Sequence, residues 1–288
     1  MKIPTLVELL SCPDDKSSMT LYDNELECNE CKRKFHIDEN FLDIRPKNKI
    51  DAVNDEEQIT YSDYYTSLFQ NGDPGDEGTF GLSSHSVSAG FVTETLNHLK
   101  KNITSNDVVC DIGAATGDYS VYLAKRCKLM IHCDLDINGL LIARKKAIQE
   151  KVNNILFLRC DYFQMPFRSG KIDLSYSIDV VERGIVHDKK ILKEMFRIVK
   201  PQGTLIFDYH TKERTKLTRI HPSYLLTYSN SGIKNLLNDL PLLKFNSIGT
   251  GYVPQLKKWS NIEYSLFNPL AKFLKFPPGR KLIICFMK

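Results

Sequence analysis

The chain has 288 residues, 42% of them hydrophobic and 26% charged, and a formal net charge of +4. This composition is typical of a globular protein with one large domain and one small one. The sequence lacks the 18 consecutive apolar residues of a membrane-spanning helix, and residues 1–10 lack the basic flank and cleavage site of a secretory signal. We therefore expect a cytoplasmic protein rather than a membrane-spanning or secreted one.

Three of the eight cysteines lie close together near the start of the chain. Cys12, Cys28 and Cys31 fall within the first 47 residues, and the last two form a C-x-x-C pair. In a cytosolic protein this spacing favours zinc over disulfides. Asp15 or His36 would have to supply the fourth ligand, although structural zinc sites prefer Cys and His to carboxylates. The alternative is a small ribbon fold that has lost its metal.

The next segment reads as a linker. Residues 51–57 are acidic, residues 71–78 are rich in Gly and Pro, and an aromatic, helix-like stretch at 61–69 lies between them. We expect three parts in the chain: a small module at 1–47, a linker and cap at 48–95, and a large domain at 96–288.

A buried strand at 108–112 opens the most informative part of the large domain. Asp111 lies in this strand, and Gly113 and Gly117 follow it in a turn that leads into a helix. Such a turn presents backbone N–H groups to a nucleotide-like ligand at the carboxyl end of the strand. Its spacing departs from the G-x-G-x-x-G pattern of dinucleotide sites, so it favours a nucleoside with a short zwitterionic tail.

A second parallel strand is predicted at 129–134. It ends at Asp134, 23 residues beyond Asp111, near the offset at which a carboxylate binds ribose hydroxyls in doubly wound folds. Asp134 is therefore the ribose candidate. Asp136, two residues later, is interpreted as the start of the next helix.

Five segments of the large domain together resemble the class I S-adenosylmethionine-dependent methyltransferases. Residues 108–119 resemble D-I-G-x-G-x-G with Ala115 in place of the middle glycine, 134–144 resemble D-x-S-x-x-x-L-x-x-A-R, 160–167 resemble G-D-A-x-x-L-P-F, 171–183 resemble F-D-L-V-x-S-x-x-V-L-E-H with Arg183 in place of histidine, and 191–207 resemble L-x-E-x-x-R-V-L-K-P-G-G-x-L-x-I. The segments follow one another in the order and spacing of that family.

The resemblance implies an α/β, Rossmann-like fold with a seven-stranded, mainly parallel sheet whose last strand is antiparallel, preceded by a small ribbon-like module. Beyond residue 207 we expect a helix at 233–240 and strands near 243–250 and 281–287. The implied cofactor is S-adenosyl-L-methionine. Its implied binding residues are Asp111, Gly113, Ala114, Ala115, Gly117, Tyr119, Asp134, Leu135, Cys160, Asp161, Tyr162, Ser177 and Asp179. Asp161 would accept a hydrogen bond from the adenine amino group.

Residues 12–46 resemble a zinc-ribbon-like module that precedes many bacterial methyltransferase domains, with the pattern C-P-x-C and then C-x-x-C. Asp15 stands where the second cysteine is usual. The resemblance implies a metal site of Cys12, Asp15, Cys28 and Cys31, in which the fourth ligand departs from the family.

The acceptor side of the site is less well determined by sequence. In the resembled family the region before the first motif covers the cofactor, so Tyr61, Tyr64, Tyr65 and His85 are pocket candidates; alternatively, the linker aromatics pack the two modules together. Tyr209, beside His210, is a further pocket candidate. A hydroxyl acceptor needs a base. His210 is the leading candidate because it follows the fifth strand at the edge where ligands bind; His85 and His187 are alternatives, and the reaction can also proceed without a base.

We predict methyl transfer to an oxygen or nitrogen atom of a small molecule. One alternative is an RNA methyltransferase acting on a ribosomal RNA base, with Lys32, Arg33 and Lys34 on the nucleic acid, although the N-P-P-Y motif of many base-methylating enzymes is absent. Another is a non-catalytic binding partner. Residues 251–288 hold seven Lys or Arg and one Glu, a net +6, which would attract an anionic acceptor or a membrane surface unless it is only a solvated basic face. The oligomeric state stays open.

Overall fold

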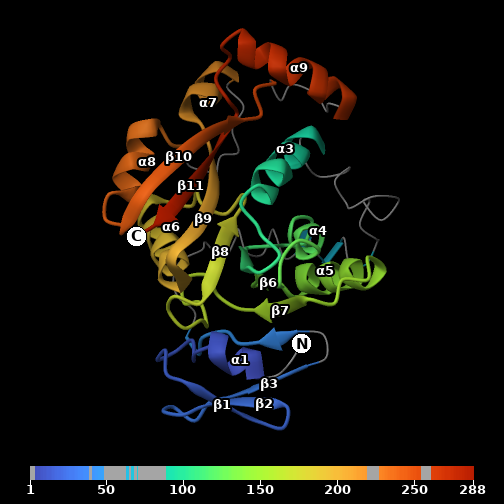
Figure 1. Ribbon diagram of the computed structural model, residues 1–288, viewed down its shortest axis with the longest axis vertical. Helices are drawn as coiled ribbons and strands as arrows, with labels where there is room; N and C mark the ends of the chain where they lie inside the picture. The colour runs from blue at the N-terminus through green and yellow to red at the C-terminus, as the bar shows by residue number, and fades with distance from the viewer. Residues whose placement is uncertain are drawn as a thin grey trace.

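The strands at the centre of the large sheet are buried along most of their length. The computed structural model describes residues 4–38, 41–48, 63–64, 66–67, 70, 89–218, 227–253 and 261–288. The parallel strands are β5 (Val108–Ile112), β6 (Leu129–Asp134), β7 (Ile155–Arg159), β8 (Ile172–Ser177) and β9 (Val199–His210). Strands that are apolar on both sides are typical of a parallel sheet with helices on both faces, and Figure 1 shows that arrangement.

The strand order is β10-β11-β9-β8-β5-β6-β7-β4. β11 (Arg280–Met287) runs antiparallel to both of its neighbours, β9 and β10 (Leu242–Thr250). The seven strands from β7 to β10 confirm the predicted Rossmann-like sheet, with the last strand antiparallel. β4 (Leu42–Asp43) was not expected, and it adds an eighth strand parallel to β7.

Helices cover both faces of the sheet. They are α3 (Ala89–Lys100), α4 (Ser120–Ala124), α5 (Ile137–Gln149), α6 (Ile185–Ile198) and α8 (Asn230–Leu237). Neighbouring side chains of one strand enter different cores: Val109 packs in the cluster with α3 and α4, whereas Cys110 packs in the cluster with α6 and α8. This alternation follows from the two-residue period of a strand. None of the described helices is long and apolar enough to cross a membrane.

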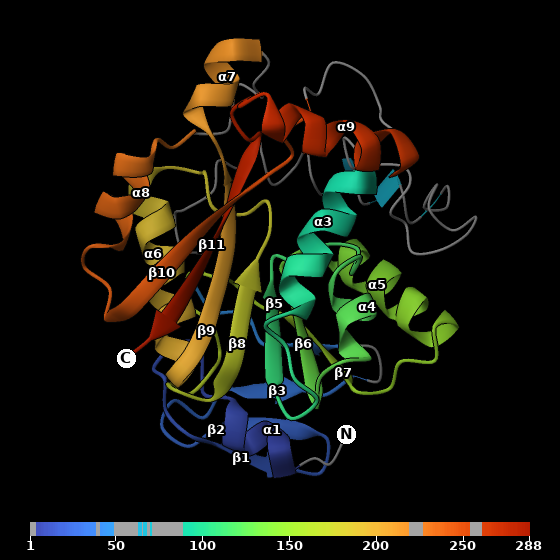
Figure 2. The same cartoon turned by 45° about the horizontal axis from the view of Figure 1, so that its top comes forward.

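Two further helices lie together at one end of the molecule in both overall views (Figures 1 and 2). They are α7 (Lys212–Thr218), which follows β9, and α9 (Asn261–Phe273), which precedes β11. The helix expected at 233–240 is α8, which begins at Asn230 because the Ser229 side chain accepts a hydrogen bond from the N–H of Gly232 and caps it.

The N-terminal part of the chain forms a separate antiparallel sheet. The strands of this sheet are β1 (Met19–Tyr22), β2 (Glu25–Cys28) and β3 (Lys34–His36), and the helix α1 (Pro4–Leu9) precedes them. The end of α1 and the segment after it contact the loop after β7 in the large domain: the Ser11 N–H donates to the Pro166 carbonyl at 3.0 Å, and the Arg168 N–H donates to the Leu9 carbonyl at 2.9 Å. The expected module end at 47 comes after β4, which belongs to the large sheet, and the expected domain start at 96 falls inside α3.

Candidate functional site

The turn after β5 has the close packing that its glycines suggested. Gly113 and Gly117 have positive φ angles of 69° and 81°. A Cβ atom at Gly113 would lie 2.4 Å from Val180 Cγ2, and one at Gly117 would lie 2.7 Å from Ala143 Cβ. Ala115, which replaces the middle glycine of the resembled motif, also has a positive φ of 48°, a conformation that L-residues other than glycine adopt at a cost.

The carboxylate of Asp134 connects the end of β6 to this turn. Its Oδ2 accepts from the Ala115 N–H at 2.7 Å, and its Oδ1 accepts from the Asp136 N–H at 2.8 Å. Burial raises the pKa of Asp134 to about 6. Each carboxylate oxygen can accept more than one hydrogen bond, so the same group can hold the turn and still accept from two hydroxyls of a ribose.

Two other acidic residues shape the neighbouring loops. Asp136 caps α5 by accepting from the N–H groups of Asn138 and Gly139, as predicted for a helix start. The Oδ1 atom of Asp161 accepts from the Phe163 N–H at 2.8 Å, and burial raises the pKa of Asp161. Both side chains therefore fix loops at the carboxyl edge of the sheet, where Asp161 is the adenine candidate.

Asp111 lies beneath the turn, in register with His132 of β6 and Tyr176 of β8. Its side chain is buried, its Oδ2 atom has no hydrogen-bond partner among the described residues, and burial raises its pKa to about 8. Ser177 is also fully buried and donates to the Ile112 carbonyl at 2.9 Å, so its hydroxyl joins β8 to β5. Cys160 is buried, while Ala114, Tyr119, Leu135 and Tyr162 are half-buried around the same edge.

A histidine and a buried glutamate form a pair on the neighbouring strand end. His210 ends β9, and its Nδ1 lies 2.7 Å from Glu182 Oε2, while its backbone N–H donates to Glu182 Oε1. Burial raises the pKa of Glu182 to about 8 and lowers that of His210 to about 4. Between these two pKa values the pair holds one proton, which it loses as the pH rises through about 8.

An arginine holds the carboxylates beside this pair. Arg280 Nη1 lies 2.5 Å from Asp208 Oδ2, and its Nη2 pairs with Asp179. Asp208 in turn accepts from the Asp179 N–H at 2.8 Å, and burial raises the pKa of Asp208 to about 6. Glu182, Asp208 and Arg280 were not singled out by sequence reasoning. The only early signal was Glu182, which lies in the resembled V-L-E-H segment.

The loop after β8 touches both halves of the site. Its Val180 fills the space that a side chain at Gly113 would need, and its Glu182 holds His210. Because β5, β8 and β9 are adjacent and parallel, their carboxyl ends meet at one edge of the sheet. The cofactor turn and His210 therefore lie on either side of one short loop.

The structure also describes three other predicted residues. Tyr209 is buried against Tyr228, with its hydroxyl 3.4 Å from Asn230 Oδ1, so its side chain is part of the core. The His187 ring lies 5.9 Å from Phe163, beside the loop after β7. Tyr64 is exposed. Tyr61, Tyr65 and His85 lie outside the described residues.

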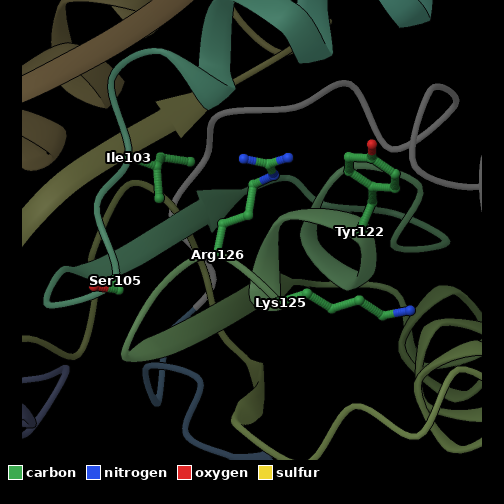
Figure 3. A pocket seen from close by; sticks show the side chains of 5 residues that line it. All are labelled: Ile103, Ser105, Tyr122, Lys125 and Arg126. Carbon is green, nitrogen blue, oxygen red and sulfur yellow. The ribbon is translucent and has the colours of Figure 1, made fainter.

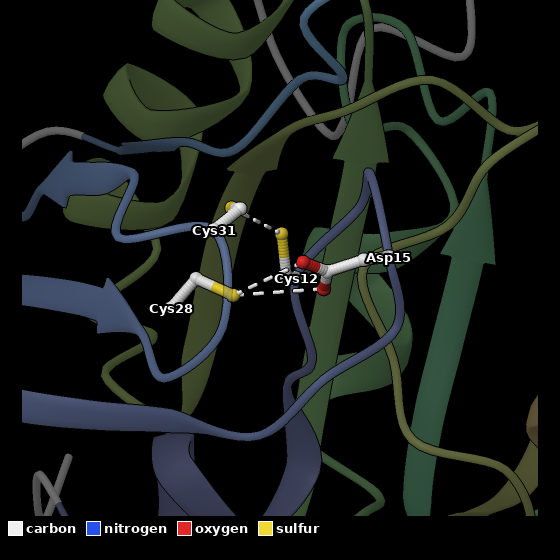
Figure 4. Close-up of side chains that lie close together, drawn as sticks. All are labelled: Cys12, Asp15, Cys28 and Cys31. Carbon is white, nitrogen blue, oxygen red and sulfur yellow. Dashed lines mark hydrogen bonds between the residues drawn. The ribbon is translucent and has the colours of Figure 1, made fainter.

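The predicted metal ligands come together in the N-terminal sheet. Figure 4 shows the side chains of Cys12, Asp15, Cys28 and Cys31 pointing toward one another, and one ligand atom from each lies within 4.8 Å of the others. Cys12 and Cys31 have sulfurs 3.7 Å apart, and Cys28 Sγ lies 3.5 Å from both Asp15 oxygens. His36, the alternative ligand, is not in this group.

These separations fit a tetrahedral zinc ion. Zn–S bonds of about 2.3 Å and Zn–O bonds of about 2.0 Å give tetrahedral edges of about 3.8 Å for S···S and about 3.5 Å for S···O. The Ser17 N–H donates to Asp15 at 2.9 Å and holds the pKa of this carboxyl near 2, so Asp15 is an anion. The four side chains therefore fit the metal that the resembled module implies.

A separate hollow lies at the opposite edge of the sheet from the cofactor turn. Figure 3 shows its lining of Ile103, Ser105, Tyr122, Lys125 and Arg126. Ile103 and Ser105 precede β5, and the other three lie in or just after α4. It is therefore distinct from the edge that carries Asp134 and His210.

Residues 110–207 match a family model described as a methyltransferase domain. The matched segment contains the turn after β5, Asp134, Asp161 and the loop after β8. Residues 110–207 of the chain therefore form part of a methyltransferase domain. This match agrees with the predicted methyltransferase family and enzyme class, and one similar structure described below holds S-adenosylmethionine, the predicted cofactor.

The relatives of this methyltransferase domain share part of the chain. The ubiquinone/menaquinone biosynthesis C-methyltransferase UbiE of Rickettsia prowazekii is 30% identical over 112 residues, covering 36% of this chain and 44% of that protein. UbiE of Brucella abortus is 27% identical over 119 residues, covering 40% of this chain and 44% of that protein. The chain thus spans less than half the length of these curated relatives.

Solved structures support the fold of the whole methyltransferase domain. Magnesium protoporphyrin IX methyltransferase of Synechocystis PCC 6803 with bound S-adenosylmethionine has a TM-score of 0.54 at 15% identity, covering 83% of this chain and all of that one. The YcgJ protein of Bacillus has a TM-score of 0.50 at 16% identity, covering 68% of this chain and 99% of that one.

Proposed function

We propose that the chain transfers a methyl group to a small-molecule acceptor and that His210 removes the acceptor proton. The observation that supports this is the loop after β8, which packs Val180 on the cofactor turn and places Glu182 on His210. When bound at the turn, S-adenosylmethionine supplies an electrophilic methyl group on a sulfonium. The protein then has to hold the acceptor in line and accept its proton.

Glu182 sets the form in which His210 works. When Glu182 is ionised it accepts the Nδ1–H of the imidazole, which fixes Nε2 as the basic atom. Burial of Glu182 and its raised pKa of about 8 mean that this form grows as the pH rises toward 8. The buried Arg280 favours the ionised form and keeps Asp208 in place beside it.

The acceptor atom is a further part of this proposal. We predicted oxygen or nitrogen from the sequence, and the relatives named as C-methyltransferases add a carbon atom as a third candidate. In each case a proton has to leave the acceptor, so the pair of His210 and Glu182 serves all three.

The RNA alternative has less support. Of the three basic residues expected to contact nucleic acid, Arg33 pairs with Asp14 at 2.8 Å, and Lys34 lies 3.3 Å from Glu25. Their charges are therefore partly neutralised within the N-terminal sheet, where sequence-independent RNA binding needs an unpaired basic surface.

The proposal is tested by incubating the full chain with methyl-labelled S-adenosylmethionine and a cell extract, then separating small molecules from RNA and protein. We expect label in the small-molecule fraction, and a loss of about 100-fold or more with His210→Gln, in line with the contribution of a general base. His187→Gln is the matched control and should retain the wild-type rate. Label found only in RNA, or equal rates for both variants, would overturn the proposal.

We also propose that Cys12, Asp15, Cys28 and Cys31 hold a zinc ion. The tetrahedral separations between their ligand atoms support it. The ion would crosslink the segment around Cys12 to the hairpin that carries Cys28, and so stabilise the small sheet.

A further inference from the structure

One face of α9 exposes large apolar side chains. Leu266, Leu270, Phe273 and Leu274 are 66%, 49%, 80% and 58% exposed. Their spacing of i, i+4, i+7 and i+8 places them on one stripe of the helix. Single exposed apolar residues are common on protein surfaces, but a continuous stripe is typical of an interaction surface.

A different face of α9 attaches the helix to the domain. Tyr264, Asn268 and Ala271 are buried at a spacing of i, i+4 and i+7. The Tyr264 hydroxyl donates to Glu94 of α3 at 2.5 Å, and Asn268 accepts from the Tyr252 N–H at 2.7 Å. Because this second face fixes the helix, the exposed stripe faces away from the core as a stable surface.

Both helices carry charges of both signs, with an excess of lysine over Glu213 of α7 and Glu263 of α9. Lys272 and Lys275 are exposed on or next to α9, and Lys212 and Lys216 are exposed on α7, which lies at the same end of the molecule in both views (Figures 1 and 2). Arg214 of α7 donates to the Gly251 carbonyl at 3.3 Å, in the segment that Asn268 also holds. The two helices are therefore held to the same segment of the chain, and together they carry the apolar stripe and a net positive charge.

We propose that this α7–α9 surface docks on an anionic membrane. Apolar side chains that enter the lipid boundary and lysines that meet anionic headgroups are the features of an interfacial helix. A second copy of the chain fits less well, because pairing the same face would bring the lysines of both copies together. An anionic bilayer satisfies both the apolar stripe and the charge.

The surface adjoins the acceptor side of the site. α7 begins two residues after His210, and Arg280, which holds Asp208, follows α9 after a short connection. If the proposed function is right, docking would place the acceptor side close to lipid and favour a lipophilic acceptor. Binding to the membrane itself does not depend on that function.

The test is flotation of the full chain with lipid vesicles, without cofactor or acceptor. We expect about tenfold more binding to phosphatidylcholine vesicles that contain about 30 mol% phosphatidylglycerol than to pure phosphatidylcholine, and a decrease at high salt. Leu270→Ser with Phe273→Ser should reduce binding roughly tenfold or more. Lys272→Glu with Lys275→Glu should reduce binding to the anionic vesicles alone.

The matched control is Ile148→Ser with Leu243→Ser, which removes two apolar side chains that are 63% and 66% exposed on α5 and β10. It should bind as the wild type does. Absence of vesicle binding, or equal losses in both double serine variants, would overturn the proposal. Light scattering that shows a dimer dissociated by Leu270→Ser and Phe273→Ser, without vesicle binding, would identify a second copy as the occupant and also overturn it. None of these outcomes bears on methyl transfer, which is measured separately.

Discussion

Replacing Asp134 by alanine should weaken cofactor binding and loosen the turn at the same time. The carboxylate accepts from the N–H groups of Ala115 and Asp136 at 2.7 and 2.8 Å, and we assign it the ribose hydroxyls as well. A hydrogen bond to a charged group contributes ~1.5–3 kcal/mol, and partial solvent access reduces the loss. We expect S-adenosylmethionine affinity to fall by ~2–4 kcal/mol, on the order of 30-fold to 1,000-fold.

Asp136→Ala is the matched control two residues away. It removes the cap of α5 and should lower the free energy of unfolding by ~1 kcal/mol while leaving affinity within about threefold of the wild type. Calorimetric titration of both variants with S-adenosylmethionine, with urea unfolding to correct for the folded fraction, separates the two effects. Equal affinities of the wild type and Asp134→Ala would refute the placement of the ribose.

Three further predictions concern protons and metal. Burial raises the pKa of Asp111 to about 8, so its contribution to stability is present at low pH and is lost as the pH rises through 8. Because asparagine cannot ionise, Asp111→Asn should raise the free energy of unfolding by ~1–3 kcal/mol at pH 8 and by much less at pH 4. Urea titrations at both pH values check this, and a larger gain at pH 4 would contradict it. The methyl-transfer rate should rise with pH through about 8, the pKa of Glu182, and Glu182→Gln should lower the rate and remove that rise; an unchanged pH profile would count against the pair. The purified chain should contain one zinc ion by mass spectrometry and should show the absorption of tetrahedral cobalt after the zinc is exchanged for cobalt. Cys28→Ser should lose the metal and have a lower melting temperature than the wild type. A wild-type chain that keeps its melting temperature after the metal is removed would contradict the site.

Local patterns were enough to predict the sheet and the tight turn after β5. The strands around Asp111 and Asp134 are apolar runs that end in small or acidic residues. The spacing between these two strands is typical of a doubly wound fold. The seven-stranded sheet and the cap at Asp136 followed from those signals. β4 could not be predicted from local patterns, because a two-residue strand is stable only through its pairing with β7.

The acceptor side could not be predicted to the same depth because its contacts join distant parts of the chain. Arg280 and Asp208 are 72 residues apart in sequence, and Glu182 and His210 are 28 apart. No periodic pattern relates residues at such separations; only the strand order brings them together. His210 could be singled out because its position depended on one strand end alone.

The measurement that tests the central claim most directly is a crystal structure of the full chain with S-adenosylhomocysteine. We predict that the ribose hydroxyls lie within about 3.2 Å of the Asp134 carboxylate and that the thioether sulfur faces His210 across the loop that carries Val180 and Glu182. A ligand bound away from Asp134, or with its sulfur turned away from His210, would contradict the proposed site.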